Sequence, residues 1–172
     1  MLKLYVMRHA KSSWDDPSLT DYQRSLSGRG KRDAQRIAQF LADNHVSIDL
    51  AYVSSAKRTV ETFSYLKSLR IPESKFLKNH YLANYELLLK RIKKTKKDYA
   101  SILLLNHEPA CKDLTTALAQ SYIFPKKNFT QNKFSTAAIA FLEFDCKGWD
   151  QIDSCKAVLK NFVTPKSLNL RV

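Results

Sequence analysis

Two histidines, each placed directly after a run of apolar residues, are the first side chains in this sequence that could do chemistry. His9 follows Arg8 and the apolar run 2–7, and His107 follows closely on the apolar run 101–105. Such runs are typical of buried strands, and polar residues at the carboxyl ends of parallel strands are positions where ligands bind. Both histidines are therefore candidate functional residues.

Arginine supplies the second component of such a site. Arg58 follows the short apolar run 50–53 and falls in the first turn of the helix expected next, where free backbone N–H groups and the helix dipole favour an anion. Arg8 and Arg58 could hold phosphate oxygens with their forked guanidinium groups and neutralise the charge of a transferred phosphoryl group. The alternative for Arg58 is a surface ion pair with Glu61, one turn further along the helix.

A histidine beside two arginines keeps its neutral form more easily, because the like charges oppose its protonation. A neutral imidazole can act as a nucleophile, and His9, next to Arg8, is the natural candidate. The sequence has no Walker-type glycine loop and no metal-ligand spacing. These residues predict phosphoryl transfer through a histidine nucleophile, with no metal and no cofactor.

The elements that must position these residues alternate between strand and helix. Strands are expected at 2–7, 50–53, 101–105, 137–144 and around 157–159. Helices are expected at 27–44 with Ser27 as N-cap, from Ser54 or Ser55 to about 69, at 84–98, and from Pro109 to about 121, with a polar loop at 122–136.

This alternation predicts an α/β protein, a three-layer α/β/α sandwich with a mostly parallel central sheet. In such a sheet the strand ends would deliver Arg8 and His9, the turn from Ser54 to Arg58, and His107 to one crevice. A length of 172 residues with only three Gly and five Pro fits one domain over residues 1–172.

The charge balance favours anionic partners, since the chain has a formal net charge of +13. Ten Lys or Arg within residues 67–97 face only two Glu. Such a segment is either a solvated helix face or a docking surface for an acidic protein or nucleic acid. Because no nucleic-acid recognition motif or interleaved aromatic accompanies it, we expect no nucleic-acid partner.

The three cysteines, Cys111, Cys146 and Cys155, are odd in number and contain no C-x-x-C pair, which predicts neither a disulfide framework nor a four-thiolate zinc site. No apolar run reaches the roughly 18 residues of a membrane span, and the first ten residues lack a signal-peptide core. We therefore expect a cytoplasmic protein with reduced thiols and no membrane partner. His45 and His80 are expected on the surface, and Trp14 either lines the mouth of the site or packs on the core.

Four motifs, in order, resemble those of the histidine phosphatase superfamily, and most of all its small SixA-type phosphohistidine phosphatases. They are Met7-Arg8-His9-Ala10-Lys11-Ser12, Arg24-Ser25-Leu26-Ser27-x-x-Gly30, Ser54-Ser55-Ala56-x-Arg58-Thr59-x-Glu61-Thr62 and Leu105-Asn106-His107-Glu108-Pro109. A later segment, Ser135-Thr136-Ala137-Ala138, resembles one that those enzymes place near the phosphate. Ala10 stands where many members have glycine.

The resemblance implies a phosphoglycerate mutase-like fold and a role for each matching residue. His9 would become the phosphohistidine intermediate, while Arg8, Arg58 and His107 bind the phosphoryl group. Arg24 and Thr136 would also contact the substrate, although Arg24 could instead pair with Asp21.

The carboxylic acid that protonates the leaving oxygen in larger branches has no clear counterpart. Glu108 is the first candidate for this proton donor, the alternative being a carboxylate that complements the helix dipole; Asp15 and Asp16 are weaker candidates. A phosphohistidine imidazole, with a reference pKa of about 6.5, leaves without such help.

The sequence therefore predicts a metal-independent phosphatase that acts on phosphohistidine of a protein partner. The alternatives are a small-molecule phosphomonoesterase of the same superfamily and a catalytically silent basic binding module.

Overall fold

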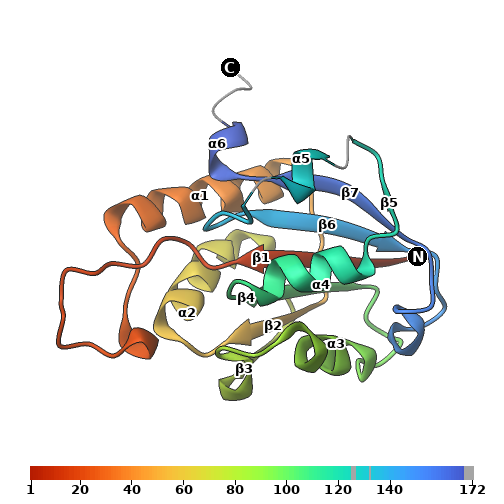
Figure 1. The fold of residues 1–172 in the computed structure, drawn as a ribbon, viewed down its shortest axis with the longest axis horizontal. Helices are drawn as coiled ribbons and strands as arrows, with labels where there is room; N and C mark the ends of the chain where they lie inside the picture. Colours follow the sequence, from red (N-terminus) through yellow and green to blue (C-terminus); the bar gives the residue numbers. More distant parts are fainter. Residues whose placement is uncertain (125–126, 132, 169–172) are drawn as a thin grey trace.

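The computed structural model describes residues 1–124, 127–131 and 133–168, and these contain a seven-stranded sheet in the order β3-β2-β4-β1-β6-β7-β5 (Figure 1). The strands are β1 (Leu2–Arg8), β2 (Leu50–Ser54), β3 (Glu73–Leu77), β4 (Ser101–Asn106), β5 (Ser121–Tyr122), β6 (Ile139–Phe144) and β7 (Ala157–Val163). Strands β1, β4, β2 and β3 run parallel, whereas β6 is antiparallel to both β1 and β7.

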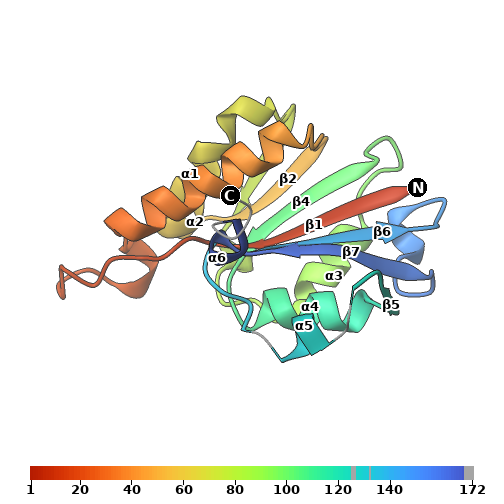
Figure 2. The same cartoon turned by 90° about the horizontal axis from the view of Figure 1, so that it is seen from above.

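Helices cover both faces of this sheet, as Figure 2 shows. One face packs against α1 (Gly28–Asp43), α2 (Lys57–Ser64) and the 3-10 turn η2 (Tyr65–Leu69); the other packs against α3 (Tyr85–Lys93), α4 (Ala110–Leu118) and α5 (Lys127–Thr130). Shorter elements are η1 (Asp21–Gln23), η3 (Lys78–His80), η4 (Trp149–Gln151) and α6 (Pro165–Leu168). Separate apolar clusters fill the two interfaces, so the expected three-layer sandwich is confirmed.

The register of the central strands aligns the polar residues at their ends. Arg8 of β1 lies opposite Asn106 of β4, and the next residue, His9, donates its backbone N–H to the Asn106 carbonyl at 3.0 Å. Val53 of β2 lies opposite Leu105. The carboxyl ends of β1, β2 and β4 therefore meet at one edge of the sheet, where the expected functional residues follow.

The helix that begins after β2 does not use the expected caps. Ser54 is the last residue of β2, and the Ser55 hydroxyl accepts a hydrogen bond from Tyr22, so α2 begins at Lys57 with Ala56 at the N-cap position and no side-chain cap. By contrast, Ser27 caps α1 as expected and accepts a hydrogen bond from the backbone N–H of Gly30.

Two strands are additional to those expected. Strand β3 lies at the sheet edge with its residues exposed or half-buried, so it lacks the apolar run that marks the central strands. Strand β5 has only two residues, and it lies with α5 in or beside the segment expected to be loop. Helix α3 ends at Lys93 rather than near residue 98.

Two expectations about single residues were wrong. His80 is fully buried in η3, beside the ring of Tyr52, and not on the surface. Cys146 and Cys155 form a disulfide, because the β6–β7 connection brings residues nine positions apart to a Cα–Cα distance of 5.9 Å. Cys111 is buried and free.

Within the described part of the chain, no helix combines the length and the apolar character needed to cross a membrane.

Gly30 lets the first turn of α1 contact the segment that follows His9. A Cβ atom at this position would overlap the Lys11 carbonyl oxygen and lie 2.9 Å from its carbonyl carbon. The same carbonyl accepts hydrogen bonds from the backbone N–H and the hydroxyl of Ser27. Since these obstructing atoms are backbone, the segment would have to shift to admit a side chain.

Replacing Gly30 by alanine should therefore lower the free energy of unfolding by about 1–3 kcal/mol, the usual cost of overpacking. The matched control is Gly28→Ala, because the nearest atom to a Cβ there is a side-chain nitrogen of Arg32 at 3.7 Å. Urea unfolding of both variants measures the difference. Equal stability of the two would show that Lys11 moves at no cost.

Candidate active site

A cavity of about 480 Å³ lies at the edge of the sheet where β1, β2 and β4 end. Apart from the weaker donor candidates Asp15 and Asp16, the site residues expected from the sequence line it: Arg8, His9, Arg24, Arg58, His107, Glu108 and Thr136. The structure thus brings together side chains from the ends of β1 and β4, the first turn of α2 and three loops.

His9 is held with one ring nitrogen free of a proton. Its Nδ1 lies 2.7 Å from the Ala10 carbonyl oxygen, which can only accept, so Nδ1 has the proton and Nε2 has the lone pair. Nε2 accepts a hydrogen bond from Arg58 Nε at 3.2 Å. Burial, the neighbouring His107 and the charges of Arg58 and Arg8 outweigh the Ala10 hydrogen bond and lower the pKa of His9 to about 3. His9 is therefore a neutral imidazole at physiological pH.

His107 lies beside it, with a distance of 5.0 Å between the two ring centres. Its Nδ1 accepts from Arg58 Nη2 at 3.3 Å, so its Nε2 donates to the Ser54 hydroxyl at 2.8 Å. Burial, and then the charge of Arg58, lower the pKa of His107 to about 3. This ring is likewise neutral and is held at both nitrogens.

Arg58 pairs with Asp21 and not with Glu61. Its Nη2 lies 2.9 Å from Asp21 Oδ2, and its Nη1 donates to the Asp21 backbone carbonyl at 2.5 Å. The Glu61 carboxylate instead accepts the backbone N–H of Leu26 at 2.6 Å, which anchors the loop before α1. The helical spacing was therefore misleading, because Arg58 extends from the first turn of α2 toward the cavity.

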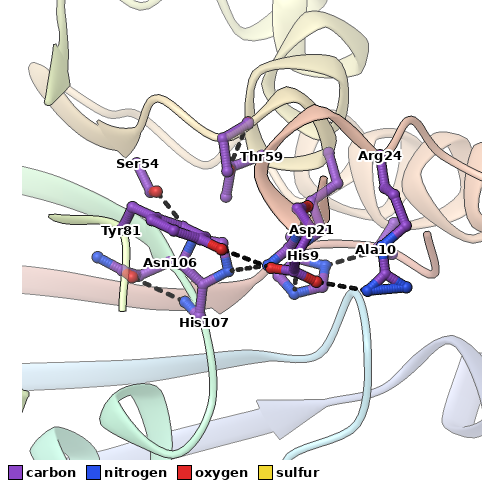
Figure 3. A network of polar contacts seen from close by, with 11 residues as sticks. His9, Ala10, Asp21, Arg24, Ser54, Thr59, Tyr81, Asn106 and His107 are labelled. Atoms are coloured by element: carbon purple, nitrogen blue, oxygen red, sulfur yellow. Dashed lines mark hydrogen bonds and ion pairs between the residues drawn. The ribbon is translucent and has the colours of Figure 1, made fainter. Parts of the chain in front are cut away.

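Asp21 is a site residue that the sequence did not single out as functional. Its carboxylate accepts hydrogen bonds from Arg24 at 2.5 Å, from Arg58 and from the Tyr81 hydroxyl at 2.7 Å (Figure 3). Burial alone would raise the pKa of Asp21, but the hydrogen bonds from Tyr81, Arg58 and Arg24 lower it to about 2. The only signal in the sequence was the spacing of Asp21 to Arg24, weighed as a simple ion pair.

Tyr81 is the second residue missed, since it follows η3 and has no motif around it. Its ring packs edge-on against His107, with ring centres 5.5 Å apart.

Arg24 fulfils both expectations from the sequence, because it pairs with Asp21 and also lines the cavity. Trp14 lines the mouth, 70% exposed, with the Arg24 guanidinium 3.2 Å from its ring centre.

Two arginines of the cavity have buried donors without a partner among the described residues, Nε of Arg8 and Nη1 of Arg24. Unpaired buried donors are costly, and an anion in the cavity is one group that could accept from them. The turn around Thr136 is fixed against this end of β1, since the Ala137 N–H donates to the His9 carbonyl at 3.0 Å.

The Glu108 carboxyl group lies where both expectations place it, at the cavity and at the start of the helix that follows. It lines the cavity, and its Oε2 accepts the Lys112 backbone N–H at 2.9 Å in the first turn of α4. Burial raises its pKa, against the effect of the Lys112 hydrogen bond. Asp15 and Asp16 are exposed, accept hydrogen bonds from Ser13 and Ser18, and lie outside the cavity.

Chemically, the cavity offers a neutral imidazole nitrogen among three guanidinium groups. Such an arrangement can bind a phosphoryl group and attack it. In the described part of the chain, no three His, Cys, Asp or Glu side chains are placed to hold a metal ion.

Comparison with known families agrees with this chemistry. Residues 4–101, which include His9, Arg24 and Arg58, match the model of the histidine phosphatase superfamily, branch 1. The chain belongs to the histidine phosphatase superfamily. Membership of this superfamily supports phosphatase activity for this protein.

Similar proteins include both protein phosphatases and others. The Nakamurella multipartitia protein described as phosphohistidine phosphatase SixA has a TM-score of 0.83 at 19% identity, over 95% of this chain and 96% of that one. A protein histidine phosphatase SixA in complex with tungstate has a TM-score of 0.78 at 22% identity, over 97% and 99%. Phosphoserine phosphatase 1 of Hydrogenobacter thermophilus is 41% identical over 81 residues, 45% of this chain and 34% of that protein. The structural matches confirm the SixA-type, phosphoglycerate mutase-like fold.

The neutral histidines predict a pH-dependent stability. In the folded state the pKa values of His9 and His107 are about 3 and that of buried His80 is about 4, whereas an unfolded histidine takes a proton near pH 6.5. Stability is therefore full above pH 6.5 and falls as the pH drops, by up to about 2 kcal/mol per histidine at pH 5.

Urea unfolding at pH 7 and pH 5 measures this loss. His80→Leu should remove about a third of this loss, because His80 is one of the three histidines that cause it. The substitution breaks no hydrogen bond to a described residue, since neither ring nitrogen of His80 has a partner among them. An unchanged pH dependence in that variant would contradict the assignment for His80.

Asp21→Asn should reduce kcat for phosphate release from a phosphorylated substrate about tenfold, or roughly 1.4 kcal/mol in the activation barrier. The reason is that an amide holds Arg58 and Arg24 more weakly than a carboxylate does. Steady-state kinetics with Asp16→Asn as the exposed control measure the effect. Equal rates for the two variants would exclude a positioning role for Asp21.

Proposed function

We propose that this protein hydrolyses phosphohistidine on a protein partner through a phosphorylated His9 intermediate, without metal or cofactor. The observation that supports it is the state of His9: its Nε2 lone pair faces Arg58, and its proton is held on Nδ1 by the Ala10 carbonyl. A neutral imidazole next to cations that bind phosphate is the nucleophile that this reaction needs.

The reaction would take place in two steps. The incoming phosphoryl group takes over the Arg58 hydrogen bond that His9 Nε2 accepts, and Nε2 then attacks the phosphorus atom in line. The new N–P bond forms as the bond from phosphorus to the substrate nitrogen breaks. The electron pair of that bond stays on the substrate ring, which leaves as a neutral imidazole because its other nitrogen has a proton. Arg8, Arg58 and His107 would bind the phosphoryl oxygens during this transfer, and Arg24 and Thr136, which also line the cavity, would contact the substrate. Water then attacks the phosphorylated His9, which regenerates the imidazole and releases inorganic phosphate.

Preference for a nitrogen leaving group is supported by the state of the acids in the cavity. Asp21 is a carboxylate with three donors on it and has no proton to give. Glu108, the remaining candidate donor, has one carboxylate oxygen bound to the Lys112 N–H. An imidazole leaves with little protonation, whereas an alcohol needs a general acid. The names of the SixA proteins of similar fold support the same substrate class.

A second candidate function is that of a small-molecule phosphomonoesterase. Burial raises the pKa of Glu108, and its carboxyl group lines the cavity, where it could act as the general acid that an oxygen leaving group needs. The local similarity to a phosphoserine phosphatase points the same way. Glu108 is thus the residue whose replacement distinguishes the two candidates.

Two further expectations stay predictions: a single domain over residues 1–172 and a cytoplasmic location. The Cys146–Cys155 disulfide bears on the location, because disulfides are less common in reducing compartments such as the cytoplasm than outside them.

Phosphate release in EDTA from a phosphohistidine-bearing protein and from an aryl phosphate tests the proposal. Wild type should act on the protein, and His9→Ala should lose about a thousandfold or more of that activity. Glu108→Gln should leave hydrolysis of phosphohistidine within about threefold. Turnover of the aryl phosphate alone, lost in Glu108→Gln, would instead establish the phosphomonoesterase; no activity on either substrate would exclude both.

A further inference from the structure

The many cations of residues 67–97 do not have equivalent surroundings. Lys75 pairs with Glu73 at 2.9 Å and Lys93 pairs with Asp153 at 2.6 Å. Lys90, Arg91 and Lys94 form no ion pair with a described acid. These three side chains line a hollow of about 270 Å³ together with Asn79 and Leu87, which we call the basic hollow.

The last turn of α3 and its C-cap Lys94 place these cations away from the core, with Lys90 and Lys94 exposed and Arg91 half-buried. Leu88 and Ile92 are fully buried in the core, and Lys90, Arg91 and Lys94 follow each other within about one turn. The helix dipole favours cations in a last turn, by about 0.3–1 kcal/mol each. It does not account for the convergence of three of them with Asn79, which comes from η3, a different element.

The short segment 79–82 contributes residues to both the basic hollow and the active-site cavity. Asn79 lines the hollow, and Tyr81 and Leu82 line the cavity. Between them, His80 is fully buried and fixes the segment to the core. The Leu82 side chain lines the cavity and is 69% exposed.

We infer that the basic hollow docks carboxylate side chains of the phosphorylated partner protein while the phosphoryl group occupies the active-site cavity. This inference rests on the proposed function. Three cations without acidic partners match a cluster of Asp or Glu on a protein surface. A nucleic acid is a poorer match, because no aromatic side chain lines the hollow to stack on a base, and the exposed rings of Trp14 and Phe76 belong to other hollows.

Docking by charge acts mainly on encounter and KM, and added salt weakens it. The variant that removes it is Lys90→Glu/Lys94→Glu. The control is Lys147→Glu/Lys156→Glu, which makes the same charge change at two exposed lysines in the β6–β7 connection. The two substrates are phosphoramidate itself and an acidic protein phosphorylated on a surface histidine.

For the docking variant we expect KM for the phosphorylated protein to rise about tenfold, with kcat and phosphoramidate turnover within twofold of wild type. The control should keep both substrates within about twofold. The salt dependence of KM should be steep in wild type and nearly flat in the docking variant.

Equal effects of the two double variants, or equal losses on both substrates, would overturn docking at this hollow. Binding of a DNA oligonucleotide that is lost in the docking variant, without a change in KM for the protein, would also overturn it and assign the hollow to nucleic acid. Failure of the proposed function is a separate result, because wild type would then release phosphate from neither substrate and the docking inference would fall with it.

Discussion

The guanidinium group of Arg58 joins the parts of the cavity that come from separate regions of the chain. It donates to His9, to His107 and to both the backbone and the carboxylate of Asp21. Because one rigid, planar cation makes all these contacts, it fixes the positions of the two imidazoles and of η1, which begins with Asp21, relative to each other. Its charge also helps to keep both imidazoles neutral, so the geometry and the protonation state of the site have one origin.

The parts of the site that follow strands could be predicted from the sequence. Apolar runs identify β1, β2 and β4, and the parallel arrangement of such runs brings their ends together, which places His9, Arg58 and His107 correctly at one cavity. Asp21 and Tyr81 lie in connections without periodicity. Their proximity depends on how two loops fold over the cavity, and local sequence contains no signal for that.

The other differences have local physical causes. Ser54 and Ser55 look like helix caps, but their hydroxyl groups bind His107 and Tyr22 instead. His80 looked like a loop residue because η3 is a single 3-10 turn, too short to show periodicity. Strand β3 is at a sheet edge and therefore lacks an apolar run. For the two serines a tertiary contact outweighs a capping propensity, which is only a weak guide on its own.

Because its main donors already have acceptors within the protein, Arg58 makes hydrogen bonds that an incoming anion must exchange rather than simply add. The net gain on binding is then smaller than the number of contacts in the complex would suggest. Inorganic phosphate, which has no further contacts to contribute, is held less firmly than a substrate whose remaining parts contact the surface. We therefore expect weak product inhibition by inorganic phosphate, since the protein's own acceptors compete with the phosphate for the Arg58 donors.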